Sequence, residues 1–172
     1  VSQDEDDVEE RVTTQGMALG STDLEMVRDV TNSFDKIVGL RFRSIPIPQG
    51  STITNSYVEF TVNDDTASQT TNLLIQGEAA DNASPFTSAK GNVSSRPRTA
   101  ASTACNNVPA WNIEGEKKQT PNITPLIQEI IARPGWVNGN NIVIIISCSG
   151  RRVADAHDRT PANAPLLVIQ YQ

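Results

Sequence analysis

The sequence predicts an all-β protein, an antiparallel β-sandwich of the jelly-roll type with one short α-helix. Three observations support this class. Short apolar or alternating segments recur along the 172 residues, turn residues stand between them, and only one segment has helical spacing. Many short strands separated by turns are typical of sandwiches and barrels.

The run Ile-Val-Ile-Ile-Ile-Ser at 142–147 is the expected central strand. It is almost wholly apolar and β-branched, which suits a strand that is buried on both faces. Asn-Gly-Asn-Asn precedes it and Ser-Gly follows closely after it, so the run is too short for a helix.

The other strands follow from local pattern. Segment 36–43 alternates apolar and other residues, so we expect a half-buried strand there. Segment 45–50 contains Pro46 and Pro48 and is expected to be an edge or a turn. Region 79–110 is polar and predicted to be a loop with at most one short strand. Further strands are expected within 16–27 (one or two), 53–62, 71–77, 110–114 and 166–171.

One helix is predicted after residue 123. Thr124 suits the N-cap and Pro125 the first helical position, and Pro134 with Gly135 ends the segment. The apolar residues of this helix fall on one side: Leu126, Ile127, Ile130 and Ile131.

The charge is concentrated at the N-terminus. The formal net charge is -6, and six of the 20 acids lie in the first ten residues, so 14 acids balance 14 bases in the remainder. A neutral body argues against a nucleic-acid partner. No apolar run approaches the roughly 20 residues that span a bilayer, so we expect no membrane insertion. We therefore divide the chain into an acidic N-terminal segment, 1–15, and a sandwich domain, 16–172.

The acidic segment has the composition of a disordered tail unless something ties it down. Either its own body or a neighbouring subunit could do so, and the second alternative predicts a homo-oligomer or filament. Val8 and Val12 could add to a sheet as an edge strand. The bases that could accept the acids are Arg96, Arg98, Arg151 and Arg152, which could equally pair with local acids.

Cysteines and sequons bear on the compartment. Cys105 and Cys148 lack metal-site or Cys-x-x-Cys spacing, and either a disulfide between them or two reduced thiols fits the sequence. Glycosylation sequons begin at Asn82, Asn92 and Asn122 and suit an exported protein.

Several short sequence segments, taken together in their order over residues 17 to 171, resemble a family of extracellular β-sandwich repeats. This family is related to DNRLRE-type, carbohydrate-binding-module-like jelly rolls. The resemblance implies a secreted or surface-attached module that binds polysaccharide or builds extracellular structure, often with structural calcium. Calcium prefers carboxylate and carbonyl oxygens. The candidate calcium ligands are Glu25, Glu78, Asp81, Asp155 and Asp158. The matching phrases include Gly-Ser-Thr-Asp-Leu-Glu-Met at 20–26, Val-Gly-Leu-Arg-Phe at 38–42, Ile-Gln-Gly-Glu-Ala-Ala-Asp-Asn-Ala at 75–83 and Gly-Arg-Arg-Val-Ala-Asp-Ala at 150–156.

No pattern points to catalysis. His157 is the single histidine, and the strained Gly-x-Ser-x-Gly turn of a serine nucleophile is absent, so we expect no enzyme and no catalytic residue. Sugar binding usually needs an exposed aromatic ring, for which Tyr57 and Trp136 are the candidates.

The leading hypothesis is a non-enzymatic extracellular structural module that assembles into a fibre or matrix through its N-terminal segment. The alternative is a carbohydrate-binding module of the cell surface or secreted milieu. A hydrolase or lyase ranks third.

Overall fold

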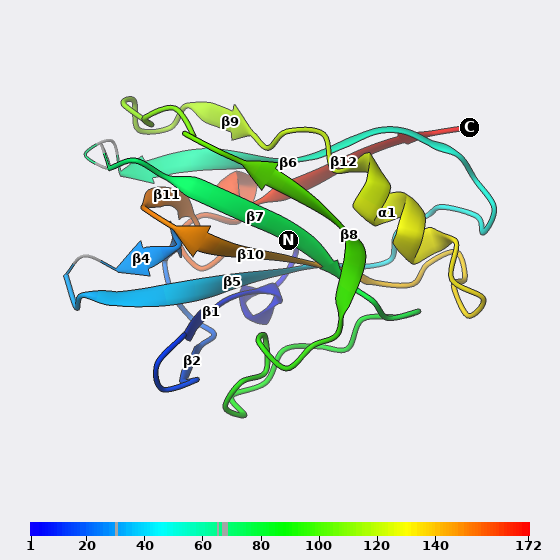
Figure 1. Cartoon of the computed structure of the whole chain (residues 1–172), viewed down its shortest axis with the longest axis horizontal. Coiled ribbons are helices and arrows are strands. Elements are labelled where there is room, and N and C mark those ends of the chain that lie inside the picture. Colours follow the sequence, from blue (N-terminus) through cyan, green and yellow to red (C-terminus); the bar gives the residue numbers. More distant parts are fainter. Residues whose placement is uncertain (30, 65, 67–68) are drawn as a thin grey trace.

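The computed structural model describes residues 1–29, 31–64, 66 and 69–172 as two antiparallel sheets packed face to face, with one α-helix (Figure 1). The predicted all-β sandwich with one short helix is confirmed. Within these residues the larger sheet has seven strands and the smaller has five.

The larger sheet carries the N-terminal strand. Its order is β2-β1-β5-β10-β7-β8, and β4 also pairs with β5. Its strands are β1 (Asp7–Arg11), β2 (Met17–Ala18), β4 (Arg28–Asp29), β5 (Phe34–Phe42), β7 (Asn72–Glu78), β8 (Arg98–Cys105) and β10 (Ile142–Ser149).

The smaller sheet has the order β12-β6-β11-β3, with β9 also pairing with β6. Its strands are β3 (Asp23–Met26), β6 (Ile53–Asp64), β9 (Lys117–Gln119), β11 (Arg152–Asp155) and β12 (Leu166–Tyr171). Two short 3-10 turns complete the elements, η1 (Asp4–Asp6) and η2 (Pro161–Asn163).

The strand β10 is buried on both faces, as predicted from its apolar run. Ile144 and Ile146 face the main core between the sheets, whereas Val143 and Ile145 face a second apolar cluster on the outer side of the larger sheet. Because successive side chains of a strand alternate, a continuous apolar run serves two cores at once.

The helix α1 (Thr124–Ile131) buries its predicted apolar side against β6, β7 and β8. The predicted cap is wrong by one position, because Ile123 is the N-cap and Thr124 is already helical. Asn122 takes the capping role, since its Oδ1 accepts a bond of 2.7 Å from the Thr124 N–H.

Two strand predictions in the middle of the chain are wrong. Segment 110–114 is not a strand, although Trp111 is buried against Phe60 in the core. Region 79–110 contains more than a short strand, because β8 spans eight residues of it. The residues of β8 are mostly Ala, Thr and Ser, whose small size conceals an edge strand from a pattern based on apolar alternation.

The remainder of the long loop covers the outer face of the larger sheet. Ala83, Phe86 and Val93 form the second apolar cluster with Val8 and the outer residues of β10. Gly39 of β5 allows this close approach, because a Cβ there would lie 2.6 Å from the Phe86 ring. The loop and the N-terminal strand are therefore packed against each other.

Candidate functional site

The candidate site is the place where the first 18 residues lie on the body. We call residues 1–18 the N-terminal arm; it comprises η1, β1 and β2. In this chain β1 is not an acidic tail but an internal strand of the larger sheet, between β2 and β5. Its register with β5 runs from Asp7 opposite Leu40 to Arg11 opposite Lys36. The acidic residues therefore enter a sheet that their composition alone would not predict.

The outer side of β1 faces the long loop. Val8 is fully buried in the second apolar cluster. Glu10, two residues on, accepts bonds of 2.8 Å from the backbone N–H groups of Val93 and Ser94. The arm thus supplies both an apolar anchor and a hydrogen-bond acceptor to the loop that covers it.

The inner side of β1 faces the other sheet. Glu9 accepts a 2.7 Å bond from the Glu25 backbone N–H and lies 2.6 Å from the Nζ of Lys36. Lys36 also bonds to the Glu25 carboxylate and lies 3.9 Å from that of Asp29. One ammonium therefore joins carboxylates from β1, β3 and β4.

Burial perturbs the ionisation of this cluster. It raises the pKa of Glu9 to about 7, and raises that of Glu25, although Lys36 acts in the opposite direction on both. Burial alone would lower the pKa of Lys36, but the two glutamates raise it overall. The arm is consequently held by a charge cluster whose protonation matters near neutral pH.

The start of the arm contacts the end of the chain. His157 donates its backbone N–H to Asp7 over 2.8 Å, and its Nδ1 lies 2.6 Å from the Asp4 carboxylate. The Val1 ammonium donates to the Pro165 carbonyl over 2.6 Å. Burial raises the pKa of Asp7 to about 6.

The remaining two acids of the arm, Asp6 and Glu5, lie near two arginines, one within β5 and one directly after it. Asp6, which is fully buried, lies 3.1 Å from Arg41 and 2.5 Å from Arg43. Glu5 lies 3.6 Å from Arg43. All six acids of the arm therefore have a partner on the body of the same chain.

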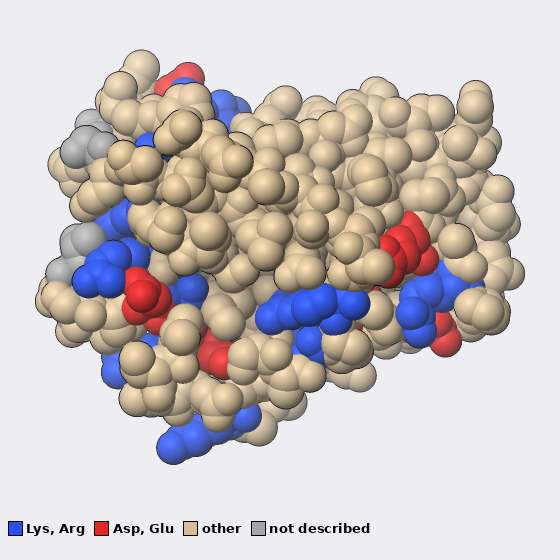
Figure 2. All heavy atoms as spheres, viewed as in Figure 1, with Lys and Arg blue, Asp and Glu red and all other residues tan. Residues whose placement is uncertain are grey.

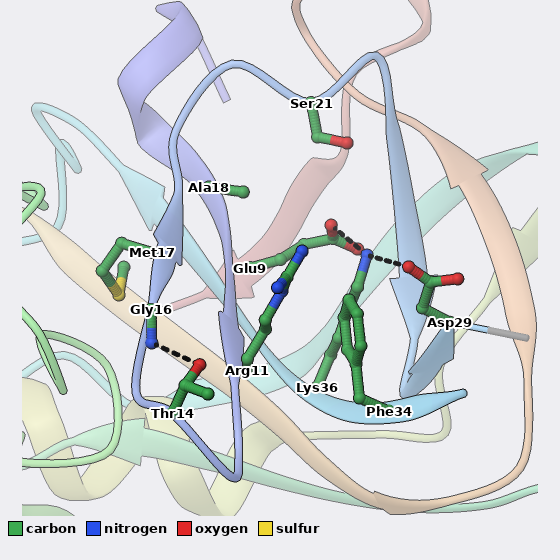
Figure 3. A pocket seen from close by; sticks show the side chains of 10 residues that line it. All are labelled: Glu9, Arg11, Thr14, Gly16, Met17, Ala18, Ser21, Asp29, Phe34 and Lys36. Atoms are coloured by element: carbon green, nitrogen blue, oxygen red, sulfur yellow. Dashed lines mark hydrogen bonds and ion pairs between the residues drawn. The ribbon is translucent and has the colours of Figure 1, made fainter. Parts of the chain in front are cut away.

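An open pocket of about 350 Å³ lies between the arm and the body (Figure 3). Glu9, Arg11 and Met17 come from the arm, whereas Phe34 and Lys36 come from β5. The Arg11 guanidinium lies 4.0 Å from the centre of the Phe34 ring. Because the arm and the body each form part of its wall, the pocket would open if the arm detached from the body.

Three of the four arginines that we expected to accept the acids have other partners in this chain, whereas Arg98 lies within the influence of Glu10 of the arm. Arg96 is buried and lies 2.7 Å from Glu78, and Arg151 lies 2.6 Å from Asp64. Arg152 is buried and donates to the carbonyls of Val108 and Pro109. Arg98 is within the electrostatic influence of Glu10, which opposes the lowering of the Arg98 pKa by burial. Val12, the other predicted assembly residue, is 49% exposed.

Four of the five candidate calcium ligands are each engaged with different groups, whereas the buried Oδ2 of Asp158 has no hydrogen-bond partner among the described residues. Glu25 bonds to Lys36, Glu78 to Arg96 and Asp81 to Arg133. Asp155 accepts from two asparagines, and burial raises the pKa of Asp158. Among the described residues, no group of three or more His, Cys, Asp or Glu side chains could hold a metal ion. Calcium binding stays a prediction from the sequence.

The two candidate sugar platforms differ in exposure. Trp136 is 2% exposed and its Nε1 donates to the Ile47 carbonyl over 2.9 Å, so the expectation that it is exposed is wrong. Its ring packs in the main core. Tyr57 on β6 is half-buried.

The predicted Cys105–Cys148 disulfide is wrong for this structure, because both thiols are free. Sheet register gives the reason. Leu73 of β7 is opposite Cys105 on one side and Cys148 on the other, so a whole strand separates them. Two strand spacings amount to about 9.5 Å between Cα atoms, whereas a disulfide tolerates at most about 7 Å.

The three sequons are in loops. Asn82 and Asn122 are exposed and Asn92 is half-buried. Each already accepts a backbone N–H bond through its amide oxygen, from Asn141, Thr124 and Thr87 respectively. Glycosylation stays a prediction.

Comparisons with known proteins add no family. No protein-family model and no curated protein matches this chain. The resemblance to extracellular sandwich repeats therefore stays a prediction. No helix among the described residues is long and apolar enough to cross a membrane.

The sequence contained a signal for the true partners of the arm. Lys36, Arg41 and Arg43 occur on or directly after an otherwise apolar strand, where a buried base needs an acid. Residues 4–10 of the arm are a cluster of six acids without a base.

Proposed function

We propose that the chain is a non-enzymatic, extracellular structural module that assembles by exchange of the N-terminal arm between copies. The observation that carries the proposal is that the arm is held almost entirely by groups of the body. Its six acids, its ammonium and Val8 all meet residues beyond position 24. Such contacts are equally available to the arm of another copy, which is the basis of domain swapping.

The connection between arm and body supports the same mechanism. Residues 19–22, Leu-Gly-Ser-Thr, lead from β2 to β3, and Gly20 is exposed with only Asp158 near an added Cβ. The loop makes one recorded backbone hydrogen bond to the body, from the Ala156 N–H to the Thr22 carbonyl. Leu19 packs against the second apolar cluster, so the weakly held part of this hinge is residues 20–22. A short hinge of this kind is the place where exchange costs least.

Exchange would leave the acceptor sheet complete. If the arm departs and is not replaced, the edge of β5 loses its partner, Arg41 loses the carboxylate of Asp6, and Lys36 loses that of Glu9 while keeping Glu25. An unpaired buried charge is costly, and so is an open apolar edge. The vacated place therefore favours the arm of a second copy, and repeated transfer from copy to copy gives a fibre.

The hinge supplies the test. Deleting Gly20 and Ser21 shortens the link, so the arm no longer reaches its own sheet but still reaches that of another copy. We expect dimers or larger species by size-exclusion chromatography with light scattering. The matched control inserts two glycines at the same place and should favour the monomer. A shortened chain that stays monomeric and folded would contradict the proposal.

A further inference from the structure

The strand β12 is an open edge of the smaller sheet. It pairs with β6 on one side, from Leu166 opposite Glu59 to Tyr171 opposite Ile53. Within the described ranges, no other strand pairs with β12 and no loop backbone bonds to the backbone of residues 166–171, although the Tyr171 hydroxyl donates to the Pro46 carbonyl over 3.1 Å. One whole side of its backbone N–H and C=O groups is therefore available.

The sequence of β12 carries none of the usual protections of an edge. Leu-Leu-Val-Ile-Gln-Tyr has no charge, no proline and no glycine. Natural edges generally avoid such composition, because an uncharged apolar edge pairs with other strands. Leu166 and Tyr171, at the two ends of β12, are 55% and 45% exposed. They are two of the five large apolar side chains that are exposed in the described part of the chain.

Two shallow hollows lie beside this edge. One, of about 180 Å³, is lined by Leu166 and Leu167 together with Ile45. The other, of about 160 Å³, is lined by Leu167, Ile169 and Tyr171 together with Ile45 and Ile47. Leu167, Ile169 and Tyr171 lie on one face of β12, and this face thus borders apolar hollows that no side chain fills. An added strand would place alternate side chains along it.

The strand itself is free of charge, although Arg43 and the N-terminal Val1 line the hollow at its start. Toward the C-terminal end of β12 in Figure 1, the visible face of the molecule in Figure 2 shows no Lys, Arg, Asp or Glu. The chain as a whole carries a net charge of -6, so most pairs of surfaces from two copies repel each other. The uncharged β12 strand is a place where two copies meet with no like charges on the pairing strands themselves.

We propose that β12 pairs with β12 of a second copy, antiparallel about a twofold axis normal to the sheet. The two smaller sheets then become one continuous sheet across the interface. A twofold interface is self-complementary, so an uncharged strand that meets itself brings no like charges together. This interface differs from arm exchange, because it uses the backbone of β12 in the other sheet, with Val1 and Ser2 of the arm beside its first residues. Together the two would give each copy two different contacts, which a fibre needs.

The test uses charge on the exposed face of β12. Leu166 and Gln170 are exposed and lie on the same face of the strand, so substitution there spares the core. The variant L166K/Q170K places positive charges on both edges, and L166E/Q170E places negative charges on both. We expect the unaltered chain to sediment as a dimer at high concentration and each variant alone to be a monomer. An equimolar mixture of the two variants should form a mixed dimer.

The matched control is I113K/V137K, which replaces two apolar side chains that are 62% and 61% exposed elsewhere. It should dimerise like the unaltered chain, and all variants should melt within a few degrees of it. A β12 variant that dimerises alone as well as the unaltered chain would overturn the proposal. So would a mixture that stays monomeric, or an unaltered chain that is monomeric but binds an apolar peptide. The hinge deletion is therefore also made in L166K/Q170K, where β12 pairing is blocked. Dimers of that chain report arm exchange alone, so the two proposals fail separately.

Discussion

Glu9 and Lys36 form a buried ion pair, with 2.6 Å between the carboxylate Oε2 and the Nζ, in a part of the chain whose composition is typical of a disordered tail. Their side chains are 2% and 10% exposed. Because Glu25 of the other sheet also bonds to Lys36, this pair connects the arm to both layers of the sandwich.

Removing the Lys36 ammonium should therefore strongly destabilise the fold. We expect Lys36→Met to lower the free energy of unfolding by about 3–5 kcal/mol, since Glu9 and Glu25 are left buried without their partner. Denaturation in guanidinium measures the loss. The matched control is Arg28→Met, which breaks the exposed pair with Asp35 and should cost about 0–1 kcal/mol. Equal losses in the two variants would contradict the structural role of Lys36.

Stability should fall as the pH rises from 5 to 8. Burial raises the pKa of Glu9 to about 7 and that of Asp7 to about 6, whereas both ionise near pH 4 in an unfolded chain. The folded chain binds these protons more tightly, so their contribution is complete below about pH 4 and is lost as the pH passes through 6 to 7. Melting temperatures should show this decline, and Glu9→Gln should reduce it. A melting temperature that increases across this range would refute the assignment.

The contact between Gly39 and Phe86 predicts a coupled pair. Gly39→Ala places a methyl group 2.6 Å from the Phe86 ring and should cost about 1–3 kcal/mol. In a Phe86→Ala background that cost should largely disappear, because the methyl group then occupies the space left by the ring. Phe86→Ala alone should cost about 3–5 kcal/mol. A double-mutant cycle measures the coupling, and strict additivity would show that the two positions do not touch.

Both thiols should titrate in the native protein. Cys148 is exposed and should react quickly with a disulfide reagent, whereas Cys105 is half-buried, burial raises the pKa of its thiol, and its reaction should be slower. Two equivalents of thiol per chain are expected under native conditions. Finding none would restore the disulfide and require a strand order in which β7 does not separate β8 from β10.

Local pattern was sufficient for much of the fold. The strand at 142–147 and the apolar side of α1 follow from periods of two and 3.6 residues, which a single segment displays. The β8 edge was missed because Ala, Thr and Ser give no apolar alternation. The disulfide was wrong because strand order places β7 between the two cysteines, and no local pattern encodes that order.

The site was harder to predict because it depends on pairs distant in sequence. The acidic composition of residues 4–10 indicated a tail, yet β5 supplies two bases and the residue after it supplies a third. Which bases accept which acids is decided by the register of β1 on β5, which places Arg11 opposite Lys36. The sequence showed both sets of charges but not their pairing.

The most direct test of arm exchange is a disulfide between copies. Val12, directly after β1, adjoins Asp35 of β5, with 2.9 Å from the Val12 N–H to the Asp35 carbonyl, and both side chains are exposed. Chains carrying V12C or D35C, each with C105A/C148A, are purified separately, mixed at high concentration and then oxidised. Arm exchange predicts covalent dimers that contain one chain of each kind. The account would be contradicted if no such dimer formed while V12C/D35C in a single chain closed its own disulfide readily.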